Sequence, residues 1–185
     1  MRDRRLVAMH RGGTLDPATH RLLAAWAADC AERVLPLFHQ QSSDLRPYEA
    51  IEKARAWARG EIAVGAAQKA AVAAHAAARA VKNGAAVAAA RAAGHAVATA
   101  HMADHCLGPC IYGVKAVVAA GGSGELESKW QLKQLPQRLR ALIASSLSKR
   151  TARSTGAKDR RRQTAPQNRG LKRDVGIRKS KLFRQ

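Results

Sequence analysis

The chain has 185 residues, of which 46% are hydrophobic but only 4% aromatic, and its formal net charge is +20. This length suits one domain with a real core plus an appendage. The apolar content is mainly alanine, which buries little area per residue, so we expect stability to come from many close helix contacts and a few large anchors. Charged residues and histidines interrupt the alanine-rich run, which excludes a membrane span of ~20 mostly apolar residues.

The positive charge is concentrated at the C-terminal end of the chain. Residues 149–185 hold 14 Lys and Arg against 2 acidic residues, a net charge of +12, whereas residues 1–148 carry +8. After Lys149 the helical pattern of apolar residues gives way to Arg, Lys, Ser, Thr, Gln and Gly. This composition predicts a disordered basic tail over residues 149–185.

The three cysteines, Cys30, Cys106 and Cys110, make an odd count, and the N-terminus lacks the apolar segment of a signal peptide. A reducing compartment with free thiols is the simplest interpretation, so we expect a cytoplasmic protein. Cys106 and Cys110 are four residues apart, a spacing that suits buried thiols on a helix better than a disulfide.

The first predicted elements are an arm and a long helix. Residues 1–13 predict a loose basic arm that ends in two glycines. Asp16 followed by Pro17 is a favourable helix start, with the aspartate as N-cap and the proline in the first turn. Pro36 is expected to end or bend this helix near its C-terminus. One face of the helix carries an apolar stripe formed by Leu23, Trp26, Cys30, Val34 and Leu37.

Further helices are expected along the rest of the chain. Pro47 opens a second helix that runs to Arg59, and Gly60 caps it. A third covers residues 64–82, and a fourth runs from residue 85 past residue 105, with a kink or break at Gly108-Pro109 and a helical continuation to residue 120. A flexible glycine-rich loop over residues 121–124 precedes a short helix and then another that begins at Pro136.

No segment shows the alternation typical of a strand. The sequence therefore predicts an all-α protein. Its parts are the basic N-terminal arm (residues 1–13), a compact domain of about five to seven helices (residues 14–148) and the disordered basic tail (residues 149–185).

Several short segments between Leu22 and Leu142 occur together in a recognisable order. They are Leu22–Leu37, Arg46-Pro47, Ala50–Glu52, Ala54–Ile62, Ala73–Arg79, Gly94–His105, Trp130-Gln131 and Leu135-Pro136. Together they resemble the alanine-rich helical putative immunity protein family of bacteria. The resemblance implies a non-catalytic protein that binds and neutralises a protein toxin, without a cofactor.

The histidines of the fourth predicted helix are the local cluster that suggests chemistry. His101 and His105 are four residues apart, a spacing that could supply half of a zinc site, with Asp104 beside them. On a continuous helix His95 lies about 120° from His101 and cannot join that site without a bend, whereas His75 from the neighbouring helix could. The alternative, which we favour, is that these imidazoles form hydrogen bonds between closely packed alanine faces.

An enzyme would need a metal ion shared by His101, His105 and either His75 or His95, with Asp104 orienting one ligand. The sequence contains no nucleophile elbow, Walker loop or H-E-x-x-H motif. We therefore assign no catalytic residue, metal or cofactor.

The basic tail suggests a second function, non-specific binding of nucleic acid, because neutralised phosphates release their counterions. The candidate contacts are Arg160, Arg161, Arg162, Lys172 and Arg173. A solvated tail without a function is at least as well supported, because Phe183 is the only aromatic residue in it.

Overall fold

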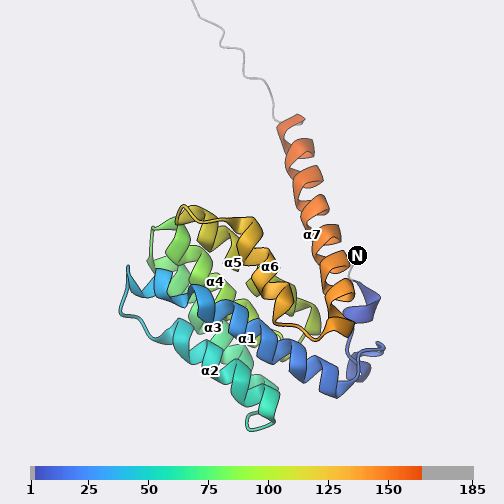
Figure 1. The fold of residues 1–185 in the computed structure, drawn as a ribbon. Coiled ribbons are helices and arrows are strands. Elements are labelled where there is room, and N and C mark those ends of the chain that lie inside the picture. The colour runs from blue at the N-terminus through green and yellow to red at the C-terminus, as the bar shows by residue number, and fades with distance from the viewer. Residues whose placement is uncertain (1–2, 164–185) are drawn as a thin grey trace, which may run out of the picture. The chain divides into compact units, whose positions relative to one another are not determined.

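The computed structural model describes the backbone of residues 3–163 and the side chains of residues 3–152. The chain divides into two units, residues 1–150 and 151–185, and the architecture described here is that of the first. The helices are α1 (Pro17–His39), α2 (Arg46–Arg59), α3 (Val64–Ala80), α4 (Gly84–Ala98), α5 (Leu107–Ala119), α6 (Gly124–Lys133) and α7 (Gln137–Gln163) (Figure 1). Three short 3-10 helices, η1 (Arg4–Leu6), η2 (Met9–Arg11) and η3 (Ala103–Cys106), complete the described chain, which has no strand. The all-α prediction is confirmed.

Helix α4 lies at the centre of the domain. It packs against α1, α2, α3 and α5, and η3 also contacts it (Figure 1). Eleven of its fifteen residues are buried, and nine of these are alanines. A helix enclosed by four others needs small side chains on every face, because only these let the backbones approach closely. This requirement explains the alanine-rich composition of the chain.

The local helix signals of the sequence appear in the structure. The Asp16 carboxylate accepts a hydrogen bond from the Thr19 amide at the start of α1, and α1 ends three residues after Pro36. Gly60 adopts the left-handed conformation, with φ of 84°, just after α2. The loop predicted over residues 121–124 ends in a helix cap. The Ser123 hydroxyl accepts a hydrogen bond from the Leu126 amide at the start of α6.

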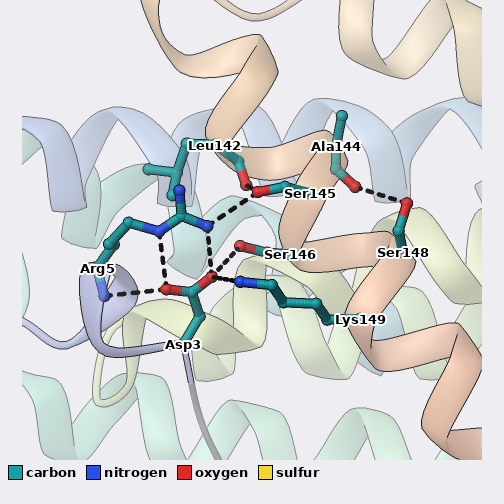
Figure 2. Close-up of polar contacts among 8 residues, drawn as sticks. All are labelled: Asp3, Arg5, Leu142, Ala144, Ser145, Ser146, Ser148 and Lys149. Carbon is teal, nitrogen blue, oxygen red and sulfur yellow. Dashed lines mark hydrogen bonds and ion pairs between the residues drawn. The ribbon is translucent and has the colours of Figure 1, made fainter.

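The N-terminal segment is ordered, and the expectation of a loose arm is wrong for residues 3–13. Leu6 and Ala8 are buried, at 2% and 3% exposure. The Asp3 carboxylate accepts hydrogen bonds from the Arg5 guanidinium at 2.7 Å and from the Ser146 hydroxyl of α7 at 2.9 Å (Figure 2). Lys149 of α7 also faces this carboxylate, and Arg5 donates to Ser145. These contacts pin the segment to α7.

The fourth predicted helix is broken earlier than expected. Helix α4 ends at Ala98, and Met102 is extended, with φ of −151° and ψ of 111°. The Thr99 carbonyl accepts a hydrogen bond from His20 Nε2 of α1 at 2.7 Å, so it is diverted from the helical ladder. Pro109 instead lies in the first turn of α5, where its missing N–H costs nothing.

The basic C-terminal region falls partly within the described residues. The composition predicts that the tail begins at residue 149, but helix α7 extends to Gln163, so the backbone is helical beyond that boundary. The expectation for residues 164–185 lies outside the described residues. Within the part of the chain that the structure describes, no helix combines the length and the apolar character needed to cross a membrane.

Candidate functional site: a histidine cluster between α3, α4 and α5

The break after α4 brings four histidines together. His75 of α3 meets His95 of α4 edge to face, with ring centroids 5.1 Å apart. His95 in turn lies 5.4 Å from His105 of η3, and His105 lies 4.9 Å from His101. The Nδ1 atoms of His95 and His105 are 3.3 Å apart. Imidazoles from α3, α4, η3 and the connection between the last two therefore form one continuous row, which we call the histidine row.

Two glycines make room for this row. A Cβ atom on Gly94 of α4 would stand 2.7 Å from Cε1 of His75, and one on Gly108 of α5 would stand 2.4 Å from Cγ of His95. Such distances do not occur between real side chains, so each ring lies directly on the backbone of the next helix. The histidines are thus part of the helix packing and are held in place by it.

The outer side of the row is aromatic and cationic. The Tyr112 ring of α5 stacks on His95 with a centroid distance of 5.2 Å and an interplanar angle of 14°. The Lys115 ammonium lies 5.0 Å from the centre of the same ring, and the Arg91 guanidinium lies 5.8 Å from it. Arg150 of α7 donates to the Asp104 carbonyl at 3.1 Å. Cations from three helices therefore surround the row.

Burial and nearby charges keep two of these imidazoles, those of His75 and His95, neutral. Burial, together with the neighbouring His75, His105, Arg150 and Arg91, lowers the pKa of His95 from 6.5 to about 3. The pKa of His75 is also lowered, first by burial and then by the charges of Arg91 and Arg79. Both effects disfavour the imidazolium. At neutral pH these rings therefore present neutral N–H groups and lone pairs.

The structure corrects the geometry that the sequence suggested for these residues. Because residues 99–102 interrupt the helix, His101 and His105 are not successive positions of one helical face, and His95 lies against His105 instead of pointing away. Within the described residues, no group of three or more His, Cys, Asp or Glu side chains is placed to hold a metal ion. Asp104 is half-buried in η3, beside these histidines.

Tyr112, Arg91 and Lys115 were not predicted as site residues, because no sequence signal connects them to histidines of other helices. The basic-tail candidates lie beyond the residues whose side chains the structure describes. Arg160, Arg161 and Arg162 lie on the helical backbone of α7, and nothing is described of their side chains. Lys172 and Arg173 lie outside the described residues.

The three cysteines are buried free thiols, as the sequence predicts. Cys30 and Cys106 have no exposed surface, and Cys110 is 2% exposed. Cys110 Sγ donates to the Cys106 carbonyl at 3.6 Å. Burial raises the pKa of Cys106 and of Cys110 well above the ordinary thiol value. Such thiols are poor nucleophiles and poor metal ligands.

A second surface feature is an open cleft of about 510 Å³ lined by residues of α1, α5 and α6 and of the connection before α6. At its edge Arg33 of α1 donates to the buried Glu127 carboxylate at 2.8 Å and lies 4.2 Å from the centre of the Trp130 ring. Gln131 also donates to Glu127. At this edge the Glu127 carboxylate is therefore paired with both Arg33 and Gln131.

The fold and the two surfaces define an all-helical protein with a tightly packed core and no recognised catalytic constellation among the described residues. A family model matches residues 13–138, and the chain belongs to the Imm-5 like putative immunity protein family. Comparison with curated proteins and with solved structures returned no match. The family expected from the short sequence segments is therefore confirmed.

Proposed function

We propose that this protein binds and neutralises a cognate protein toxin in the cytoplasm, and that it does so without catalysing a reaction. The observation that carries the proposal is the match of the immunity family over residues 13–138, which covers most of the helical domain. The three reduced cysteines support a cytoplasmic location. The buried thiols and the neutral, closely packed imidazoles support a binding role, because neither set has the polarised geometry of a nucleophile and its base.

The charge of the domain indicates what kind of toxin surface it suits. Residues 3–150 hold eleven carboxylates. Eight of them form ion pairs inside the domain: Asp3, Asp29, Glu32, Asp44, Glu52, Glu61, Glu125 and Glu127. A ninth, Asp16, caps α1. Most carboxylates are therefore paired with cations of the same domain. Lys and Arg still outnumber Asp and Glu, and this net positive charge complements an acidic partner better than a basic nuclease.

Co-expression with a candidate toxin chosen from the neighbourhood of its gene tests the proposal. We expect cells that produce the toxin to grow when this chain is present, and the two proteins to co-purify. Absence of both growth rescue and co-purification would reject the function. Rescue by protein whose fold has been disrupted, for example by Ile51→Asp in the fully buried core, would also reject it, because binding requires the folded domain.

A nucleic-acid control separates the two functions that the sequence suggested. Non-specific binding to DNA would fall steeply between 50 and 200 mM salt. Growth rescue that persists while DNA binding is absent at physiological salt would assign the protection to the protein partner. Rescue lost together with DNA binding would contradict the proposal.

A further inference from the structure

Side chains from five elements gather on one side of the domain. They are His75 and Arg79 of α3, Arg91 and His95 of α4, His105 of η3, Tyr112 and Lys115 of α5, and Arg150 of α7. We call this surface the histidine–arginine face. Its cations are exposed, and its rings are half-buried. Contacts already described connect the members, and the charges of Arg79 and Arg91 act directly on His75.

The charge of this face selects an anion over a metal ion. Four exposed cations belong to it, and Asp104 is the one carboxylate among the described residues of η3, α4 and α5. A divalent ion at the His95 and His105 nitrogens would be repelled by Arg91 and Arg150, the same charges that lower the pKa of His95. An anion is attracted by both, and by the N–H groups of the rings.

The rigidity of the face favours a specific anion-binding site over non-specific electrostatic attraction by mobile side chains. Because Gly94 and Gly108 have no side chain, the His75 and His95 rings lie directly against helix backbones, and Tyr112 is stacked on His95. Arg91 and Lys115 are both drawn to the Tyr112 ring. Their positively charged groups are therefore partly ordered before a ligand arrives, which lowers the entropy cost of binding.

We infer that the histidine–arginine face binds a carboxylate-rich segment of the protein partner. This inference rests on the proposed function, which makes the partner a protein and hence makes its anions carboxylates. Arginine and tyrosine are the residue types that carry most binding energy in interfaces. The face offers Arg91 and Lys115 at the Tyr112 ring, with the His95 ring stacked against the same tyrosine.

A hexaglutamate peptide is a suitable probe, used with the full-length protein labelled at its histidines for NMR. The tail after residue 148 contains no histidine, so binding of the peptide to the tail produces no direct histidine signal. We expect the ring signals of His75, His95 and His105 to move in a saturable way, and the pKa of His95 to rise in the complex. His10 and His39 are exposed and serve as internal controls. Equal shifts at these controls would overturn the inference.

The variant Arg91→Ala/Lys115→Ala tests which side chains provide the affinity. Both residues are exposed, so the fold should be kept, which the unchanged spectrum of the remaining residues will verify. We expect the peptide affinity at the histidine row to fall about five- to tenfold. Lys53→Ala, which removes an exposed lysine from α2, is the matched control and should leave this affinity unchanged. An unchanged affinity in the double variant would reject the face as the binding site.

An oligonucleotide and the toxin complete the experiment. A single-stranded DNA with six phosphates that moves the same signals at lower concentration than hexaglutamate would overturn the assignment to a protein carboxylate. The charge-reversed variant Arg91→Glu/Lys115→Glu should fail to co-purify with a toxin that the wild-type chain retains. Full retention would reject the face while leaving the proposed function intact. If the wild-type chain retains no toxin, the proposed function fails, and the peptide titration still decides whether the face binds carboxylates.

Discussion

Acid should destabilise this domain before its carboxylates begin to titrate, because His95 is held neutral in the folded state. Its folded pKa is about 3, against 6.5 in the unfolded chain. Between these values the unfolded chain binds a proton that the folded chain does not, so stability is complete above pH 6.5 and falls as the pH is lowered. For one group with these two pKa values, lowering the pH from 7 to 5 removes about 2 kcal/mol.

Urea denaturation followed by tryptophan fluorescence measures this loss. Trp26 is buried and donates to the Gln131 carbonyl, so unfolding, which breaks this contact between α1 and α6, should change the summed fluorescence of the three tryptophans. Burial also lowers the pKa of His75 and of His20, so the wild-type protein loses stability at all three positions in this pH range. The carboxylates titrate lower, since their unfolded values lie near 4.

The variant His95→Gln isolates the contribution of one ring. The substitution removes a titrating group. The decrease in the free energy of unfolding from pH 7 to pH 5 should therefore be about 2 kcal/mol smaller than in the wild type, whatever the stability of the variant at pH 7. His39→Gln, at an exposed position of α1, is the matched control for the substitution itself. The same pH dependence in wild type and His95→Gln would refute the argument that packing against Gly108 and Tyr112 keeps this imidazole neutral.

Three further predictions concern packing, the N-terminal segment and the thiols. Gly94→Ala should lower the free energy of unfolding by about 1–3 kcal/mol, because the new methyl group meets the His75 ring, whereas Gly65→Ala, with nothing within 4 Å, should not destabilise. Equal effects would contradict the described contact. Asp3→Ala should cost about 1–2 kcal/mol through the lost Ser146 and Arg5 hydrogen bonds, while Glu61→Ala, in an exposed ion pair, should have no measurable effect. Ellman's reagent should leave the native cysteines unmodified at pH 8 and react with three thiols after denaturation, and rapid reaction of the native protein would show that the burial is wrong.

Local chemistry made part of this fold predictable. The Asp16-Pro17 pair and Gly60 act through their own backbone neighbours, so the ends of α1 and α2 follow from the sequence alone. The end of α4 coincides with a hydrogen bond from His20 to the Thr99 carbonyl, between residues 79 positions apart in the chain. No local pattern encodes that contact. The sequence predicts the break at Pro109 because proline usually interrupts a helix, but Pro109 lies in the first turn of α5, where proline is tolerated.

The candidate site was predictable in its residue types but not in its arrangement. His75, His95, His101 and His105 stood out in the sequence, yet the row depends on the break at residues 99–102 and on two glycines from other helices. Residues 3–13 were misjudged for the same reason, since their composition is basic but Leu6 is buried. Burial against distant elements is a property of the whole fold.

The enclosed position of α4 has a consequence for how this sequence can vary. Only glycine has a smaller side chain than alanine, so almost every substitution at a buried alanine of α4 adds volume. A close-packed interior resists added volume, because neighbouring side chains must move to make space. In a saturation mutagenesis experiment on this helix, tolerance among apolar substitutions should therefore divide sharply by side-chain volume. The exposed positions of the surrounding helices carry no such size limit, so the surface that meets a partner can change its chemistry while the centre of the protein keeps its sequence.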